Sequence, residues 1–158
     1  MRSILKTILC ATTGLTSTAM AADRVQMTPG RWHEVFSFTA MTVGGRPIPV
    51  DSLHPPDPVR FHCIGPEEAA NPRLYFAASE AGADCKRAEE KVEDGRLAIK
   101  LQCKLDENAP VTMVLEGTYG PQSYRLIGNG HGTLDGKPLA LSTAVDGKFV
   151  GVCTGDEK

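Results

Sequence analysis

Apolar and polar residues alternate through the second half of the chain. Leu97, Ile99, Leu101 and Cys103 fall on one side of this pattern, with charged or polar residues at most positions between them. A period of two is typical of a β-strand with one buried and one solvated face. The same alternation recurs at Val111, Met113, Leu115 and Tyr119, at Tyr124 and Leu126, and at Leu139, Leu141 and Val145.

Turn signals separate these segments. Asp94-Gly95, Asp135-Gly136 and Asp146-Gly147 are hairpin dipeptides, because both residues tolerate the positive φ of a tight turn. Gly120-Pro121 marks a further turn. The pattern predicts a mainly β fold, an antiparallel up-and-down meander of roughly seven or eight strands curled into a barrel or sandwich.

The first half of the chain is less regular. Residues 31–43 are rich in aromatic and β-branched side chains and predict a strand, which Gly44-Gly45 ends. Residues 46–58 contain five prolines and predict an extended loop, because proline cannot donate to a β-ladder. A short strand is expected over 59–64. One short helical segment is expected over 65–78, interrupted at Pro72.

The N-terminus predicts a secretory signal peptide over residues 1–21. Arg2 and Lys6 give a basic start, residues 7–20 carry no charge, and Ala19-Met20-Ala21 supplies small residues for cleavage. The mature chain, 22–158, is then a single disulfide-stapled domain in the periplasm, beginning with a polar leader over 22–28. No other stretch is long and apolar enough to span a membrane.

The charge balance narrows the range of partners. The chain carries 17 basic and 19 acidic residues, and loss of Arg2 and Lys6 leaves 15 basic against 19 acidic ones, a formal charge of −4. This mildly acidic balance, without a basic cluster, argues against nucleic acid or an anionic membrane as a partner.

Four cysteines remain after the predicted cleavage: Cys63, Cys85, Cys103 and Cys153. An even number in an oxidising compartment favours two disulfides over a zinc site, and no CxxC motif occurs. A two-residue turn at Asp94-Gly95 places Cys85 opposite Lys104, one residue out of step with Cys103. A β-bulge near the open end of the hairpin would reconcile the two. We favour Cys85–Cys103 and Cys63–Cys153, and the other two pairings stay open.

Several short motifs, taken in order, resemble a bacterial family of exported domains of unknown function. They are Pro29-Gly30-Arg31-Trp32, the segment from Cys63-Ile64-Gly65-Pro66-Glu67 to Ala70, the central pair Cys85 and Cys103, and the terminal Gly151-Val152-Cys153. Gly65 stands where that family has Ser or Thr, and Phe149 where it has Arg. The resemblance implies export, a similar fold and disulfides, and it transfers no catalytic residue.

No catalytic constellation is recognisable, so we expect no enzyme activity, catalytic residue, metal or cofactor. The leading hypothesis is a non-enzymatic binding or envelope-associated structural domain with a small lipophilic ligand. An envelope protein docking on residues 46–58 or 65–78 is the alternative. A metal-dependent enzyme using His33, His62 or His131 is the third hypothesis. The candidate ligand-binding residues are Trp32, Phe36, Tyr119, Tyr124 and His131, the last set among glycines.

Overall fold

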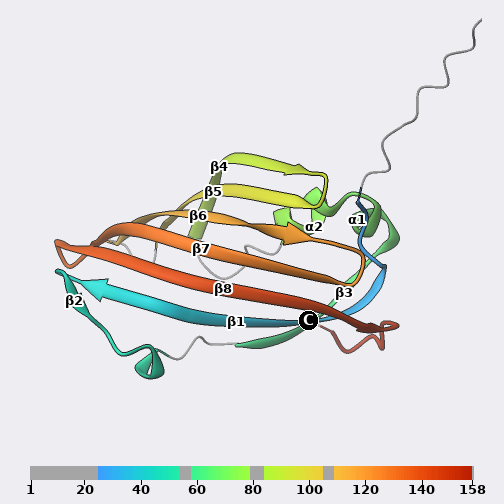
Figure 1. Ribbon diagram of the computed structural model, residues 1–158, viewed down its shortest axis with the longest axis horizontal. Coiled ribbons are helices and arrows are strands. Elements are labelled where there is room, and N and C mark those ends of the chain that lie inside the picture. The colour runs from blue at the N-terminus through green and yellow to red at the C-terminus, as the bar shows by residue number, and fades with distance from the viewer. Residues whose placement is uncertain (1–24, 54–57, 79–83, 105–108, 158) are drawn as a thin grey trace, which may run out of the picture.

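The computed structural model describes residues 25–53, 58–78, 84–104 and 109–157 (Figure 1). The strands are β1 (Gly30–Val43), β2 (Arg46–Pro47), β3 (Val59–Ile64), β4 (Asp84–Glu93), β5 (Arg96–Lys104), β6 (Pro110–Tyr119), β7 (Ser123–Leu134) and β8 (Lys137–Gly151). The helices are the 3₁₀-helix η1 (Val50–Ser52), α1 (Pro66–Ala70) and α2 (Pro72–Ala78). No helix among these residues is long and apolar enough to cross a membrane. The predicted signal peptide, 1–21, lies outside the described residues.

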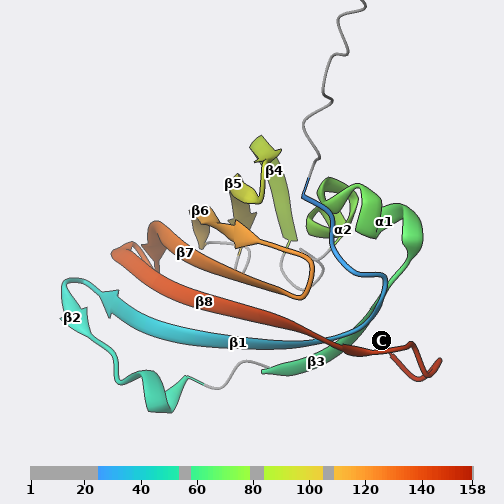
Figure 2. The same ribbon diagram turned by 45° about the vertical axis from the view of Figure 1, so that its right-hand side comes forward.

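All strands belong to one antiparallel sheet of eight strands, ordered β2-β1-β8-β7-β6-β5-β4, and β3 pairs with the first half of β1 on the side opposite β8, where β2 pairs with its last two residues. The predicted antiparallel fold is therefore confirmed. Of the two expected forms, a barrel or a sandwich, the closed barrel is not the one observed, because among the described residues no strand joins β4 to the β1 side of the sheet. The sheet is instead strongly curved, and α1 and α2 lie over one end of its concave face (Figure 2).

Two of the three expected hairpin dipeptides form turns. Asp94 and Asp135 have φ of 49° and 50°, and the glycine after each also has positive φ. The turn expected at Asp146-Gly147 is wrong, since both residues lie inside the long strand β8. Gly147 serves another purpose there, because a Cβ at this position would clash with the ring of Tyr124.

The β4–β5 hairpin contains the bulge that the cysteine register required. Val92 pairs with Leu97 next to the turn, the register shifts between Arg87 and Glu89, and Cys85 then pairs with Cys103. The structure places Cys85–Cys103 and Cys63–Cys153 at disulfide distance, with Cα–Cα separations of 3.9 and 5.6 Å. These are the two pairs that the sequence favoured.

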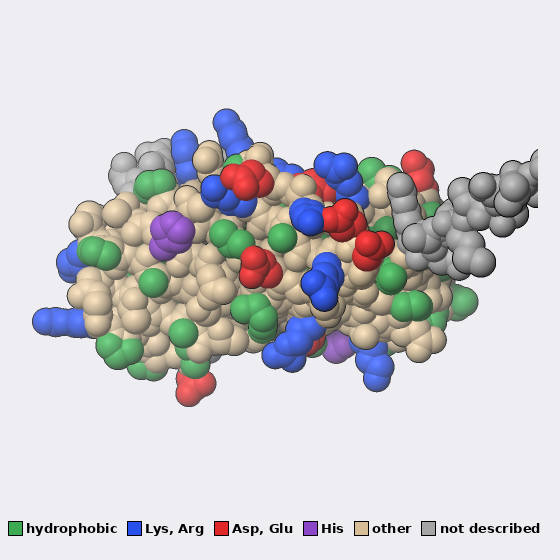
Figure 3. All heavy atoms as spheres, turned by 45° about the horizontal axis from the view of Figure 1, so that its top comes forward, with side chains coloured by type: hydrophobic (Ala, Val, Ile, Leu, Met, Phe, Trp, Pro, Cys, Tyr) green, Lys and Arg blue, Asp and Glu red, His purple; other side chains and the backbone are tan. Residues whose placement is uncertain are grey.

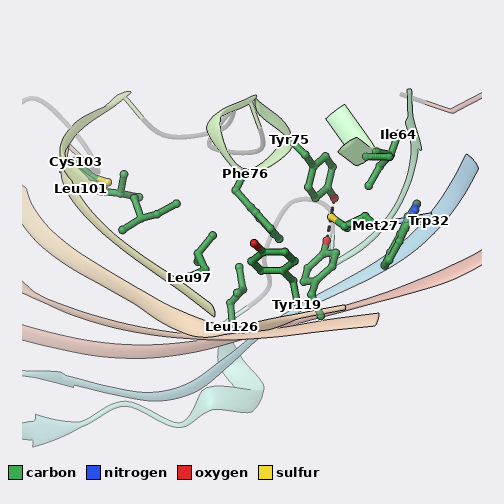
Figure 4. Packing of buried hydrophobic residues seen from close by; sticks show 13 residues of the cluster. Met27, Trp32, Ile64, Tyr75, Phe76, Leu97, Leu101, Cys103, Tyr119 and Leu126 are labelled. Carbon is green, nitrogen blue, oxygen red and sulfur yellow. Dashed lines mark hydrogen bonds between the residues drawn. The ribbon is translucent and has the colours of Figure 1, made fainter. Parts of the chain in front are cut away.

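The main core lies between the helices and the concave face (Figure 4). Trp32 is fully buried, and its Nε1–H donates to the Thr28 carbonyl at 2.9 Å. Met27 is also buried, and its N–H donates to the Ala69 carbonyl, so the part of the expected leader that is described packs against α1. The other buried apolar members of this core are Ile64, Ala69, Tyr75, Phe76, Leu97, Ile99, Leu101, Cys103, Tyr119, Tyr124 and Leu126.

The proline-rich segment runs outside the sheet edge, as expected of a loop. It contains only the two-residue strand β2 and the turn η1, and residues 54–57 of it lie outside the described residues. At its end, the Phe36 N–H donates to the Pro58 carbonyl at 2.8 Å, which begins the pairing of β3 with β1.

Candidate functional site

A buried carboxylate lies where α2 meets the sheet. Glu34 points from β1 to the concave face, between Trp32 and Phe36 in the alternation, and its side chain is 12% exposed. Its Oε2 accepts a hydrogen bond from the Tyr124 hydroxyl and lies 3.5 Å from the Tyr75 hydroxyl. The two hydroxyls lie 2.9 Å apart, and because the single proton of Tyr124 is directed to Glu34, Tyr75 donates the bond that is drawn dashed in Figure 4. Strands β1 and β7 and helix α2 thus converge on one carboxylate.

The sheet register explains how Tyr124 reaches Glu34 across an intervening strand. Glu34 pairs with Gly147 of β8, and Gly147 pairs with Tyr124 of β7. Because Gly147 has no side chain, the Tyr124 ring lies over it and its hydroxyl arrives at Glu34. On the other side of Glu34, Arg60 of β3 is the cross-strand neighbour.

His62 completes this group. Its Nε2 lies 3.6 Å from Glu34 Oε1, and this nitrogen is buried without a hydrogen-bond partner. Among the described residues one carboxylate oxygen therefore accepts from the Tyr124 hydroxyl, which is itself paired with Tyr75, and the other oxygen faces an imidazole. In such an arrangement, neutral hydroxyl donors stabilise the ionised form of the carboxylate.

Burial and hydrogen bonding act in opposite directions on Glu34. Burial alone would raise its pKa, but the adjacent His62 imidazole, the hydrogen bond from Tyr124 and the positive charge of Arg60 outweigh it, and the pKa is lowered. Burial is also the main cause that raises the pKa of both Tyr75 and Tyr124, and the nearby Glu34 charge adds to it. At neutral pH the carboxylate is ionised and the two hydroxyls are protonated donors.

Apolar side chains also lie on the concave face beyond the Glu34 group. On the inner faces of β1 and β6, Phe36, Phe38, Met41, Met113 and Leu115 are half-buried, and we call these five residues the open apolar surface. The Phe36 and Phe38 rings meet edge to face with centroids 5.2 Å apart.

A buried polar residue lies next to this surface. Thr143 pairs with Phe38 and is 1% exposed, and its hydroxyl has no hydrogen-bond partner among the described residues. A Cβ on Gly128 would clash with this hydroxyl and approach Leu115 at 2.8 Å. The glycine therefore leaves room for two neighbouring side chains, and the face is packed at this point.

The structure brings three of the five predicted ligand residues together. Trp32 stacks on Tyr124 with centroids 5.7 Å apart, and Phe76 of α2 contacts both Tyr124 and Tyr119. These rings form packed core. Phe36 lies apart from them on the open apolar surface.

His131 lies on the outer face of β7, in a shallow hollow with Lys104 and Thr112. Acidic and basic side chains are intermixed on the face drawn in Figure 3. His33 points to the outer face of β1, where its ring meets Phe61, whereas His62 points to the inner face. Within the described parts of the chain, no three His, Cys, Asp or Glu side chains gather as metal ligands would.

The sequence reading missed the Glu34 group. One signal was present: Glu34 shares the face of Trp32 and Phe36 in the strand alternation, and a carboxylate on an aromatic face requires donors. Tyr75 could not be assigned to it, because the packing of α2 on the sheet does not follow from the local pattern.

A single curved antiparallel sheet, two cysteine pairs at disulfide distance and two short covering helices define a small mainly β domain. Residues 27–153 match the family described as protein of unknown function (DUF3617), and the chain belongs to this family. No curated protein and no solved structure was found to match the chain. The predicted membership of a family without assigned function is thereby confirmed.

Proposed function

We propose that this protein is an exported, non-enzymatic binding domain that holds a small lipophilic ligand on the open apolar surface. One observation carries the proposal: Phe36, Phe38, Met41, Met113 and Leu115 are only half-buried on a concave face that the helices cover at one end alone. Apolar ligands usually bind to concave apolar surfaces. Binding then removes the apolar surface of the ligand and that of the protein from water.

The chemistry of the side chains on this surface supports the same proposal. The methionines at 41 and 113 have flexible, polarisable side chains that adapt to ligands of different shape. The Glu34 group closes the covered end and holds α2 in place.

Export is the second part of the proposal. The basic start, the uncharged stretch and the Ala19-Met20-Ala21 sequence support a signal peptide, and two cysteine pairs at disulfide distance are compatible with an oxidising compartment. Expression of the full chain in a bacterium should give a periplasmic protein. Its intact mass should correspond to a chain that begins at Ala22 and contains two disulfides. An uncleaved cytoplasmic product would contradict export.

Ligand binding is tested with N-phenyl-1-naphthylamine, a small apolar fluorophore whose emission rises in an apolar environment. We expect saturable binding to the wild type. Phe36→Asp should weaken it roughly tenfold or more, the effect of losing ~1.4 kcal/mol of contact. Ser37→Asp is the matched control, because Ser37 is the exposed neighbour on the outer face.

Phe38→Ala provides a second inward variant without a new charge, and thermal unfolding of each variant verifies that it is folded. Native mass spectrometry of the protein taken from its own periplasm would show a bound natural ligand. Absence of saturable fluorophore binding to the folded wild type, or equal weakening by Phe36→Asp and Ser37→Asp, would contradict the proposal.

A further inference from the structure

The two edge strands of the sheet differ in how they meet solvent. β4, at one edge, is interrupted by a bulge and carries Lys86, Arg87, Glu89, Lys91 and Glu93 among its ten residues. Charges and bulges of this kind protect an edge strand from pairing with another chain. β3, at the opposite edge, is a regular strand of six residues that pairs with β1 alone among the described strands (Figures 1 and 2).

The hydrogen-bond pattern between β3 and β1 shows which backbone groups of β3 are unpaired. The Phe36 N–H donates to the Pro58 carbonyl, and in an antiparallel ladder every second residue faces the partner strand. Arg60 and His62 therefore direct their backbone groups to β1, where they pair with Glu34 and Trp32. The N–H and C=O groups of Val59, Phe61 and Cys63 point away from the sheet.

The side chains of β3 divide into an apolar face and a basic face. Val59 and Phe61 lie on the outer face and are 49% and 38% exposed, and Val35, the cross-strand neighbour of Val59, is 36% exposed. Arg60 and His62 lie on the inner face. Among the residues that the structure describes, Arg60 has no carboxylate within ion-pair distance, and the pairs that are formed involve other cations.

We propose that the β3 edge binds an extended strand of a partner protein in which apolar and acidic residues alternate. Adding a strand to a sheet edge satisfies the free backbone groups, and alternate side chains of the added strand meet the two faces. Apolar residues then lie beside Val59 and Phe61, and acidic residues lie beside Arg60 and His62. Opposite charges on neighbouring strands stabilise the pairing.

A second copy of the chain fits this edge less well. Antiparallel pairing of β3 with its own copy about Phe61 would place Arg60 opposite His62, so two basic residues would meet. Self-pairing therefore offers Arg60 no carboxylate, whereas an acidic strand does. The site is separate from the open apolar surface, and from the 46–58 and 65–78 segments that the sequence suggested for docking.

The test uses two synthetic hexapeptides with blocked ends, one alternating Val and Glu and the other alternating Val and Lys. They are titrated into ¹⁵N-labelled mature protein with both disulfides intact. With the glutamate peptide we expect the amide signals of Val59, Phe61 and Cys63 to shift and their hydrogen exchange to slow. The lysine peptide should bind roughly tenfold more weakly, because it places like charges beside Arg60.

Arg60→Gln should abolish the difference between the two peptides, while Lys91→Gln on the β4 edge should leave it unchanged. Thermal unfolding of both variants verifies the fold, and Phe61→Ser offers a second way to weaken the edge if Arg60→Gln does not fold. Equal binding of the two peptides, shifts confined to β4, or absence of binding by the folded wild type would overturn the proposal. A concentration-dependent dimer in light scattering, abolished by Phe61→Ser, would assign the edge to self-association instead.

Discussion

Two buried carboxylates on the concave face are satisfied in different ways. Glu90 of β4 is bound by two cations: Arg73 Nε of α2 lies 2.7 Å from it, and Arg87 forms a second ion pair. Glu34 receives neutral hydroxyls instead, with His62 beside it. Glu90 therefore fixes α2 to the sheet by charge, whereas Glu34 does so by hydrogen bonds that require it to be ionised.

This difference predicts how stability depends on pH at Glu34. Its pKa is lower in the folded than in the unfolded protein, so its contribution to stability is complete above the unfolded value of about 4.3 and is lost as the pH falls through the folded pKa. Glu34→Gln should cost about 1–3 kcal/mol at pH 7. The difference in unfolding free energy between wild type and variant should shrink as the pH is lowered from 6 to 3.

Urea unfolding at a series of pH values measures this difference. Glu89→Gln is the control, since Glu89 is exposed and forms its ion pair with Lys100, which is also on the surface. Glu157, whose pKa is lowered to about 2 chiefly by the Thr154 N–H, is present in every variant and cancels in the comparison. If the difference in unfolding free energy between wild type and Glu34→Gln stayed constant with pH, the proposed role of the ionised carboxylate would be contradicted.

Gly147 predicts a second effect at the residue scale. Gly147→Ala would place a methyl group where the Tyr124 ring lies, so the ring must move away from Glu34. We expect a loss of roughly 1–3 kcal/mol, as for other overpacked positions. Gly120→Ala is the matched control, because its Cβ would meet only the Ser123 carbonyl at 3.8 Å.

The emission of Trp32, the single tryptophan, reports the movement of Tyr124 because the two rings stack. Unchanged stability and emission in Gly147→Ala would show that the ring is not held over this glycine.

The alternation of β1 correctly places Trp32, Glu34 and Phe36 on one face, so the position of Glu34 could be predicted from sequence. The positions of its two tyrosine partners could not. Asp146-Gly147 has the composition of a turn, and only the cross-strand position of Tyr124 explains why the strand continues through it. His131, set among glycines, suggested a ligand site, yet those glycines face inward while His131 faces solvent.

At the scale of elements, the β4–β5 hairpin shows how a bulge reconciles two constraints. The Asp94-Gly95 turn fixes the register near Val92, and the cysteine pair fixes it at the other end, one residue out of step. Ala88 is the extra residue between Arg87 and Glu89 that absorbs the difference. The sequence contained both constraints, so this irregularity was predictable, whereas the bulge in β1 between Phe38 and Ala40 had no comparable signal.

Deleting Ala88 should therefore preserve the hairpin. The pairs Glu89–Lys100 and Arg87–Leu101 would become consecutive, and each side chain would keep its face. We expect Cys85–Cys103 to form and the unfolding free energy to change by about 1 kcal/mol or less, as for surface changes. Deleting Lys100 from the opposite strand is the control, because it turns Leu101 and Cys103 to the solvent face. Free thiols in the Ala88 deletion would contradict this account.

At the scale of the whole molecule, alternation and turn signals were sufficient to predict one antiparallel sheet. Whether that sheet closes was not predictable, because closure depends on pairing between strands far apart in the chain. The observed order leaves β4 and β3 as edges, and the open apolar surface and the β3 edge both exist because the sheet does not close. The two cysteine pairs close chain segments of different length: Cys85–Cys103 spans 18 residues within a hairpin, and Cys63–Cys153 spans 90.

The two pairs should therefore differ in their contribution to stability. A cross-link stabilises mainly by restricting the unfolded chain, which predicts about 3 kcal/mol for the 18-residue loop and about 4.6 kcal/mol for the 90-residue loop. We expect Cys63→Ala/Cys153→Ala to lower the urea midpoint more than Cys85→Ala/Cys103→Ala. Both variants remove two sulfur atoms, and they differ in the length of the chain segment that is no longer cross-linked.

The Cys63–Cys153 pair also holds β3 to the C-terminal end of β8, so its loss should accelerate hydrogen exchange in β3 while the β4–β5 hairpin stays protected. The opposite order of stabilities would mean that strain or local packing, and not restriction of the unfolded chain, decides what each bridge contributes.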